Sequence, residues 1–206
     1  MIHVHGYLGE LSPATIVLAR RCALVVGGSR HLDALGVPED KRVVLGALTP
    51  ALERLRTLGP DEDALVIASG DPGFHGILRR IRLEGHPVTV QPAVSSVSAA
   101  FAAVALPWED AVVVSAHGTS VQPAITAARL HRKVAVLTAR DSGIVQLAEG
   151  LDGTGRTFVL AERLGESGER VRVLTGDEAR EELREHGAGP LTAPATDTTD
   201  LQEDLS

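Results

Sequence analysis

The chain has 206 residues, of which 44% are hydrophobic and only 2% aromatic, and its formal net charge is −7. This apolar content excludes an intrinsically disordered chain, and the length allows one large domain or two small ones. The negative charge argues against nucleic acid or an anionic membrane as a partner. Cys22 is the only cysteine, so no intrachain disulfide can form.

Nothing in the sequence has the form of a targeting or membrane-spanning segment. His3 and His5 interrupt the first short apolar run, and no apolar stretch approaches the ~20 residues that a membrane span needs. We therefore expect a cytoplasmic protein. The eight histidines show no ligand spacing, so no structural metal is expected.

Short apolar runs of β type alternate with helix-like segments, which predicts an α/β fold with a mostly parallel or mixed sheet flanked by helices. In the first half we expect strands at 2–4, 23–26, 64–68 and 88–90. Ser12-Pro13 and Thr49-Pro50 each have the form of an N-cap followed by a proline in the first helical turn. Apolar residues at helical spacing predict helices after Pro50 and around 74–81. Cys22 continues the apolar stripe of the first helix and is expected in the core.

The second half predicts strands at 111–115, 134–137 and 158–160 and a helix over 121–131. Residues 171–174 alternate in polarity, which predicts an antiparallel strand. We expect an N-terminal α/β lobe over 1–115 and a C-terminal α/β lobe over 116–187. From Ala188 onward the periodicity vanishes, so 188–206 are expected to form an acidic tail without regular structure. Pro194 is poorly suited to a central strand, so no final strand is expected there.

Two strand ends carry residues suited to holding a ligand. Ser69-Gly70-Asp71-Pro72-Gly73 follows the buried run 64–68, and its glycines let the backbone approach a ligand closely. Asp71 either binds a ligand amine or hydroxyl or caps the next helix. After the strand at 88–90, Ser95 and Ser96 either cap the next helix or present its exposed amides to a ligand.

A second set of candidates lies near Trp108 and His117. Trp108, within Leu106-Pro107-Trp108-Glu109-Asp110, has the character of a half-buried loop anchor. His117, within Ser115-Ala116-His117-Gly118, is either a hydrogen-bonded hinge residue or a group that reaches substrate. Arg30 and His31 are either solvated surface residues or binding groups for a carboxylate-rich ligand.

Together these motifs resemble the tetrapyrrole methylases. The Gly70-Asp71-Pro72 loop matches the family's S-adenosylmethionine-binding loop, and Pro92-Ala93-Val94-Ser95-Ser96 matches its Pro-Gly-Ile-Ser-Ser segment. Pro-Trp-Glu-Asp followed by Ser-x-His-Gly resembles the precorrin-6Y C5,15-methyltransferase branch. The first loop, Val4 to Glu10, departs from the family pattern, because its glycines are out of place and His5 and Tyr7 intrude.

The resemblance implies a two-lobed, homodimeric methylase that transfers a methyl group from S-adenosylmethionine to carbon 5 of a late precorrin, with or without cobalt, in cobalamin biosynthesis. A separate enzyme would carry out the C15 methylation and decarboxylation. Two alternatives remain open: a methylase of a different tetrapyrrole, and a catalytically weak paralogue that binds cofactor or tetrapyrrole as a carrier or regulatory module. The implied cofactor-binding residues are Ser69, Gly70, Asp71, Phe74, Ser95, Ser96, Leu137, Thr138 and Ala161. The implied substrate-binding residues are Arg30, His31 and His117, and His117 is also the candidate for moving a proton.

Overall fold

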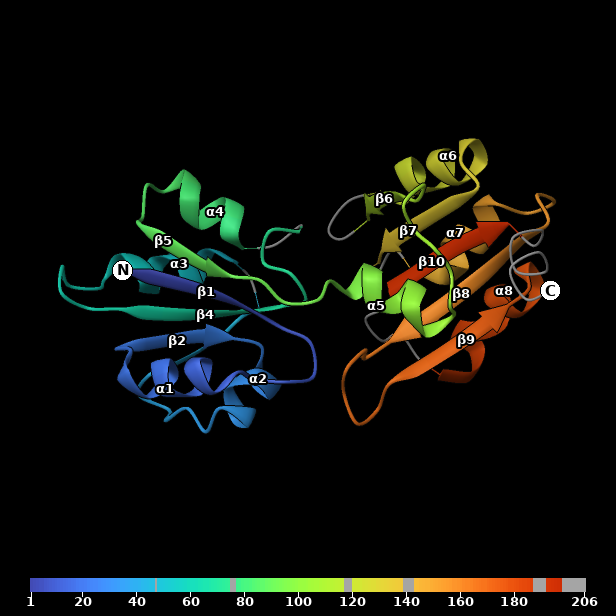
Figure 1. Cartoon of the computed structure of the whole chain (residues 1–206). Coiled ribbons are helices and arrows are strands. Elements are labelled where there is room, and N and C mark those ends of the chain that lie inside the picture. The colour runs from blue at the N-terminus through green and yellow to red at the C-terminus, as the bar shows by residue number, and fades with distance from the viewer. Residues whose placement is uncertain (47, 75–76, 117–119, 139–142, 187–191, 198–206) are drawn as a thin grey trace. The chain divides into compact units, whose positions relative to one another are not determined.

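The computed structural model describes all residues except 47, 75–76, 117–119, 139–142, 187–191 and 198–206, and it describes no side chains for 183–186 and 192–197. The chain divides into two compact units, Met1–Ser95 and Ser96–Ser206, which we call unit 1 and unit 2. Both are α/β units, as the sequence predicts (Figure 1).

Unit 1 is a parallel five-stranded sheet with the strand order β3-β2-β4-β1-β5. Alternate residues of its strands face opposite sides, and each side has its own apolar core. One core contains Val4 and Val66 with the helices α3 and α4, and the other contains Val25 and Leu65 with α1 and α2. Helices on both faces are typical of a parallel sheet, whose strands are buried from either side. Its elements are β1 (Ile2–Tyr7), α1 (Pro13–Arg21), β2 (Leu24–Gly27), α2 (Ser29–Ala34), β3 (Arg42–Val44), α3 (Leu48–Arg56), β4 (Ala64–Ser69), α4 (Leu78–Leu83) and β5 (Val88–Gln91).

Several local predictions in unit 1 are confirmed. The Ser12 side chain caps α1 by accepting a hydrogen bond from the Thr15 N–H at 3.1 Å, and Pro13 follows in the first turn. Cys22 is 1% exposed in the core, and burial raises the pKa of its thiol to about 11. A thiol that stays protonated at neutral pH is a poor nucleophile, so Cys22 is a structural residue.

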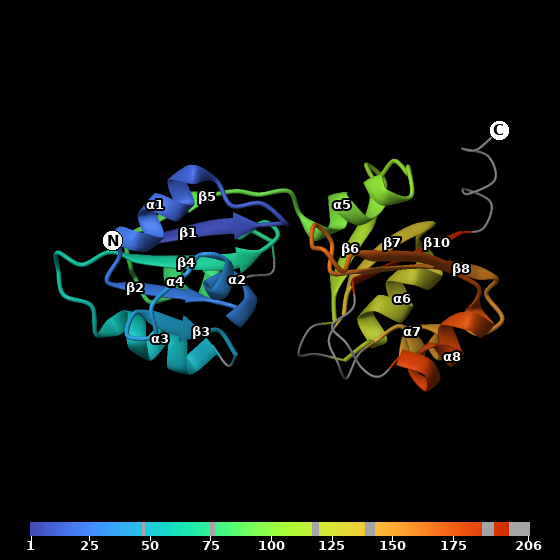
Figure 2. The same ribbon diagram turned by 90° about the horizontal axis from the view of Figure 1, so that it is seen from below.

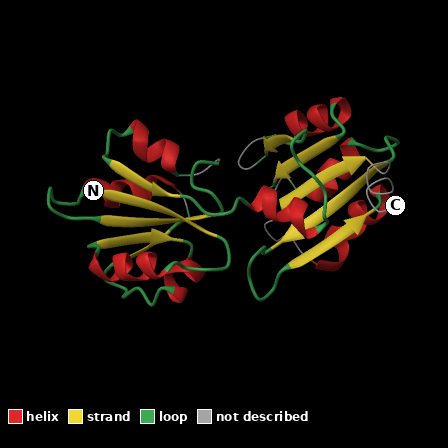
Figure 3. Ribbon diagram, viewed as in Figure 1, coloured by secondary structure: helices red, strands yellow, loops and turns green. Residues whose placement is uncertain are grey.

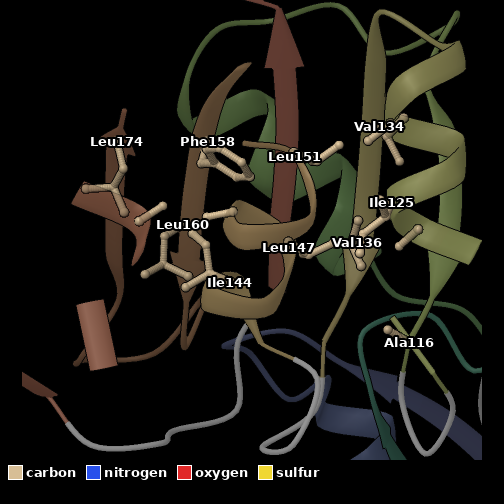
Figure 4. Close-up of a cluster of buried hydrophobic side chains, with 14 residues drawn as sticks. Ala116, Ile125, Val134, Val136, Ile144, Leu147, Leu151, Phe158, Leu160 and Leu174 are labelled. Carbon is tan, nitrogen blue, oxygen red and sulfur yellow. The ribbon is translucent and has the colours of Figure 1, made fainter. Parts of the chain in front are cut away.

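Unit 2 is a mixed five-stranded sheet with the order β6-β7-β10-β8-β9. β6 and β7 are parallel, whereas β10 is antiparallel to both β7 and β8, and β9 is antiparallel to β8. The helices α6 and α7 pack their apolar side chains on one face (Figure 4), and α5 lies against β10 on the other face (Figures 1 and 2). Its elements are α5 (Ser96–Ala103), β6 (Val112–Ser115), α6 (Gln122–Leu130), β7 (Lys133–Leu137), α7 (Ile144–Gly150), β8 (Arg156–Glu162), β9 (Arg170–Leu174), α8 (Gly176–His186) and β10 (Thr192–Asp197), coloured by type in Figure 3.

The division between the units lies earlier than the expected boundary at 115 and 116. β6 pairs with β7 in the second sheet, with Val112 opposite Val134 and Ser115 opposite Leu137. The contact boundary therefore falls between Ser95 and Ser96, and both α5 and β6 belong to unit 2.

The expectation that 188–206 lack regular structure is wrong for Thr192–Asp197, which form β10 at the centre of the second sheet. Pro194 pairs with Ala135 of β7, whereas the ladder to β8 passes from Thr192 to Ala195 without a pair at Ala193 or Pro194. Proline has no N–H to donate to a ladder. The gap toward β8 is where the sheet accommodates this missing donor.

Candidate functional site

The carboxyl ends of β1, β4 and β5 meet at one edge of the sheet in unit 1. The strands are parallel, with Tyr7 opposite Ser69 and His5 opposite Gln91. The segments that follow them, Leu8–Glu10, Gly70–Phe74 and Pro92–Ser95, therefore leave the sheet at the same edge. In open α/β sheets this edge is where ligands bind, so the structure brings together the first group of predicted site residues.

Gly6 is the point at which these segments touch. A Cβ atom at Gly6 would lie 2.5 Å from the Gly70 carbonyl oxygen and 2.7 Å from both the backbone nitrogen and the Cβ atom of Ala93. Gly70 in turn donates its N–H to the Tyr7 carbonyl at 2.6 Å and has a φ of +67°. Position 6 thus requires a residue without a side chain, and position 70 has a backbone conformation that favours glycine. The sequence analysis predicted a conformational role for Gly70 but none for Gly6.

Asp71 shapes the loop that follows β4. Its Oδ1 atom accepts a hydrogen bond from the Gly73 N–H at 2.7 Å, and its carbonyl accepts one from the Phe74 N–H at 3.1 Å. Ser69 is exposed, whereas Asp71 and Phe74 are partly buried. The carboxylate holds the turn at Gly73 and does not cap the next helix, whose N-cap residue is Ile77. This turn leads toward α4, which begins at Leu78, later than the apolar stripe from Phe74 suggests.

The altered first loop forms a compact turn beside α2. Gly9 has a φ of +81°, Leu8 forms a bridge to Glu10, and the Tyr7 hydroxyl donates to the Gly9 carbonyl at 3.4 Å. The Tyr7 ring packs on the His31 ring with their centroids 4.7 Å apart. Tyr7 and His31, from two motifs that the sequence treated separately, are therefore neighbours.

Arg30 and His31 differ in burial. His31 is only 2% exposed, so its interpretation as a solvated surface residue is wrong; the ring is covered by Tyr7 and receives a 3.4 Å hydrogen bond from Arg30 Nε. Arg30 is exposed at the start of α2. The arginine is thus the member of the pair that is presented to solvent.

In unit 2, three predicted site residues lie at one level of the sheet. Leu137 ends β7 and Ala161 lies in β8, and each pairs with Thr192 of β10, one from either side. Thr138, directly after β7, is 6% exposed, and within the described part of the chain its buried Oγ1 atom has no hydrogen-bond partner. A buried hydroxyl without a partner is costly. Thr138 Oγ1 is therefore a buried polar atom of unit 2 that a hydrogen-bonding ligand group would satisfy.

The remaining candidates fall at or beyond the division between the units. Ser95 ends unit 1, and Ser96 begins both unit 2 and α5. His117 lies outside the described residues. The structure therefore places Ser69, Gly70, Asp71, Phe74 and Ser95 in unit 1, and Ser96, Leu137, Thr138 and Ala161 in unit 2.

The Trp108 motif is held by a residue that the sequence analysis missed. Lys133 opens β7 and is only 7% exposed, and its ammonium group donates to the Pro107 carbonyl at 3.2 Å and to the Asp110 carboxylate at 3.1 Å. This hydrogen bond lowers the pKa of Asp110 below its ordinary value. Trp108 stacks on Phe101 of α5 with 45% of its surface exposed, which agrees with a half-buried anchor. The sequence did contain a signal for this contact, because a lysine at the start of an apolar strand needs polar partners.

A second missed feature follows β8. Arg163 has a φ of +53°, a conformation that non-glycine residues rarely adopt, directly after the predicted site residue Ala161 and Glu162. Its guanidinium group packs over Gly168, where a Cβ atom would lie 2.4 Å from the nearest guanidinium nitrogen. Such strain is often found at functional loops, but the sequence has no local mark for it.

The family model and the similar curated proteins all point to the same family. The model of the Tetrapyrrole (Corrin/Porphyrin) Methylases matches residues 6–180. The cobalt-precorrin-7 C(5)-methyltransferase of Salmonella typhimurium is 31% identical over 171 residues, which are 80% of this chain and 83% of that protein. The decarboxylating precorrin-6Y C(5,15)-methyltransferase of Mycobacterium tuberculosis is 38% identical over 162 residues, which are 74% of this chain but only 40% of that protein.

Solved structures show the same fold. The precorrin-6Y methylase (cbiE) of Archaeoglobus fulgidus matches with a TM-score of 0.67 at 23% identity, over 96% of this chain and 97% of that one. A uroporphyrin-III C-methyl transferase of Thermus thermophilus, complexed with S-adenosylhomocysteine, matches with a TM-score of 0.64 at 18% identity, over 95% and 91%. Among the described residues of the present chain, no helix combines the length and apolar character that crossing a membrane requires.

Proposed function

The chain belongs to the tetrapyrrole methylase family, and from that premise we propose that it transfers a methyl group from S-adenosylmethionine to carbon 5 of a late precorrin or cobalt-precorrin in cobalamin biosynthesis. The observation that carries this proposal is the similarity to the Salmonella typhimurium C(5)-methyltransferase, which extends over most of both chains. The Mycobacterium tuberculosis relative, also named for C5 methylation, supports it.

The residues present fit the implied cofactor. The missing side chain of Gly6 lets the Gly70 carbonyl and Ala93 approach β1 closely at the carboxyl edge of unit 1. Thr138 supplies a buried hydroxyl that lacks a partner among the described residues of unit 2. S-adenosylmethionine supplies an electrophilic methyl group on a sulfonium centre. From the family motifs we assign cofactor binding to Ser69, Gly70, Asp71, Phe74, Ser95, Ser96, Leu137, Thr138 and Ala161.

The protein's own contribution is alignment and exclusion of water. Methyl transfer to an electron-rich ring carbon needs donor and acceptor held in line, which binding geometry alone can supply. Arg30, exposed at the start of α2, is suited to a substrate carboxylate through its planar fork of N–H donors. His31 would act on the substrate through Arg30 and Tyr7, which contact it. His117 is proposed from its sequence motif to contact the substrate and to accept or relay a proton.

The wider proposals follow from the same resemblance. We expect a homodimer in the cytoplasm and a separate enzyme for the C15 methylation and decarboxylation. Light scattering of the purified protein tests the dimer, and a monomer at micromolar concentration would contradict it.

The test begins with calorimetric titration of the protein with S-adenosylmethionine and S-adenosylhomocysteine. We expect binding near the micromolar range, about −8 kcal/mol. Incubation with metal-free and cobalt-containing late precorrins should then add the mass of one methyl group to one of them and release S-adenosylhomocysteine. Binding without transfer to any tetrapyrrole would support the carrier alternative, which the altered first loop keeps open. Transfer only to another tetrapyrrole would support the second alternative, and absence of binding would refute the methylase proposal.

A further inference from the structure

A chain of side-chain hydrogen bonds runs beneath the carboxyl edge of unit 1. His5 Nδ1 lies 2.9 Å from Thr15 Oγ1, Thr15 Oγ1 lies 2.8 Å from Ser12 Oγ, and Gln91 Nε2 lies 3.2 Å from the same Ser12 oxygen. His5 and Thr15 are 7% and 2% exposed. We call these four residues the His5 relay; it links His5 of β1 to the last residue of β5 through the start of α1.

The direction of the relay follows from counting donors and acceptors. Ser12 Oγ accepts hydrogen bonds from the Thr15 N–H at 3.1 Å and from Gln91 Nε2, which uses both of its lone pairs. The Ser12 hydroxyl must therefore donate to Thr15 Oγ1, and among the described contacts of Thr15 the only acceptor left for its own hydroxyl hydrogen is His5 Nδ1. His5 Nδ1 is consequently an acceptor, and the proton of the neutral imidazole is on Nε2.

The surroundings of His5 agree with a neutral ring. Burial, and to a lesser extent the neighbouring His3 ring at a centroid distance of 6.5 Å, lower the pKa of His5. A proton on Nδ1 would take the remaining lone pair of Thr15 Oγ1 and leave the buried Thr15 hydroxyl hydrogen without an acceptor among its described contacts. His3 has its own partners on the same sheet, Thr89 Oγ1 at 2.7 Å and the Asp63 carboxylate at 3.9 Å.

Both ends of the relay adjoin backbone of the candidate site. Gln91 is the last residue of β5 and directly precedes Pro92–Ser96. His5 directly precedes Gly6, which is in close contact with the Gly70 carbonyl and Ala93. A shift of His5 or Gln91 would therefore be transmitted to the two segments that carry most of the cofactor candidates of unit 1.

We propose that His5, as a neutral imidazole protonated on Nε2, is a positioning residue that fixes Gln91 through Thr15 and Ser12 and so holds the Pro92–Ser96 segment in its binding conformation. The inference rests on the proposed function for its effect on cofactor binding, but the direction of the relay does not depend on it. His5, which departs from the family pattern in the first loop, thus stabilises the Pro92–Ser96 segment without contacting the ligand itself.

The experiment compares four variants of the full chain. His5→Leu and Gln91→Leu each remove one end of the relay, whereas His5→Asn keeps an acceptor at the position of Nδ1. The matched control is His3→Leu, which removes a neighbouring histidine of β1 whose partner, Thr89, precedes Gln91 on β5. We expect His5→Leu and Gln91→Leu to weaken S-adenosylhomocysteine binding roughly tenfold, the value of about one hydrogen bond. His5→Asn should recover most of that loss, and His3→Leu should bind as the unmodified protein does.

Two further readouts separate this inference from the proposed function. Imidazole ¹⁵N spectra of the unmodified protein at pH 7 should show His5 protonated on Nε2 and unprotonated on Nδ1. Hydrogen exchange at the backbone amides of 93–96 should accelerate in His5→Leu and not in His3→Leu, with or without a ligand. A proton on Nδ1, or unchanged exchange in a folded His5→Leu protein, would overturn the inference. If the unmodified protein binds no cofactor, the proposed function fails, while these two measurements still decide the relay.

Discussion

Replacing Gly6 with alanine tests the idea that three strand ends are packed into one rigid junction. The added Cβ atom would lie 2.5 Å from the Gly70 carbonyl oxygen and 2.7 Å from the Ala93 nitrogen, whereas ordinary contact begins at 3.4 Å. Both obstacles include backbone atoms, which cannot rotate away as a flexible side chain can. Overpacking of this kind costs about 1–3 kcal/mol, and we expect the upper half of that range because two segments must move.

The assay is equilibrium unfolding in urea, combined with calorimetric titration with S-adenosylhomocysteine. We expect Gly6→Ala to lower the free energy of unfolding by about 2–3 kcal/mol. We also expect it to weaken S-adenosylhomocysteine binding, because the added Cβ atom would displace Gly70 and Ala93, which belong to the segments proposed to bind the cofactor. Gly46→Ala is the matched control, since a Cβ atom there meets nothing within 4 Å, and surface changes of this kind stay within about 0.5 kcal/mol. A Gly6→Ala protein with unchanged stability and affinity would refute the close packing of the three strand ends.

Three further predictions concern the Trp108 motif and the loop after β4. Lys133→Met should lower the free energy of unfolding by about 1–2 kcal/mol, because the Pro107 carbonyl loses its donor; urea unfolding measures this, and an unchanged midpoint would contradict it. The lowered pKa of Asp110 means that its carboxylate stabilises the fold above its unfolded pKa of about 4, and that this contribution disappears as pH falls through the lower folded value. The stability difference between the unmodified protein and Asp110→Asn, below about 1 kcal/mol for this half-exposed group, should therefore be fully present at pH 6 and decrease as the pH falls below about 4. A stability difference that grows as the pH falls would contradict this sign. Asp71→Ala should weaken S-adenosylhomocysteine binding, because it removes the carboxylate that accepts the Gly73 N–H and holds the turn. Asp71→Asn keeps an acceptor oxygen and should keep most of the affinity. Equal affinities of the two variants would count against this role.

The sequence predicted features that are encoded by neighbouring residues. The Ser12 cap of α1 and the Gly70-Asp71-Pro72-Gly73 turn depend on contacts within a few positions, and both are present in the structure. The antiparallel strand β9 was also predicted, because its alternation is visible within Arg170–Leu174. Local chemistry is therefore enough for these elements.

Features that depend on distant partners could not be predicted in this way. β3 spans only Arg42–Val44, and β10 contains Pro194, so neither has a strong strand signal; each is stabilised by pairing with strands elsewhere in the sheet. The close contact of Gly6 with Gly70 and Ala93 likewise joins segments far apart in the chain. The predicted unit boundary was too late for the same reason, because the sequence of β6 does not show that it pairs with β7.

The central place of β10 also sets an order for folding during synthesis. All strand pairs of unit 1 lie within Ile2–Gln91, so its sheet can close while the rest of the chain is still being made. In unit 2, β7 and β8 have no direct pairing and are joined only through β10, the last strand in the described part of the chain. Until β10 emerges from the ribosome, both strands present open edges, which are templates for aggregation. A nascent chain is thus most vulnerable in the interval between completion of β8 and arrival of β10.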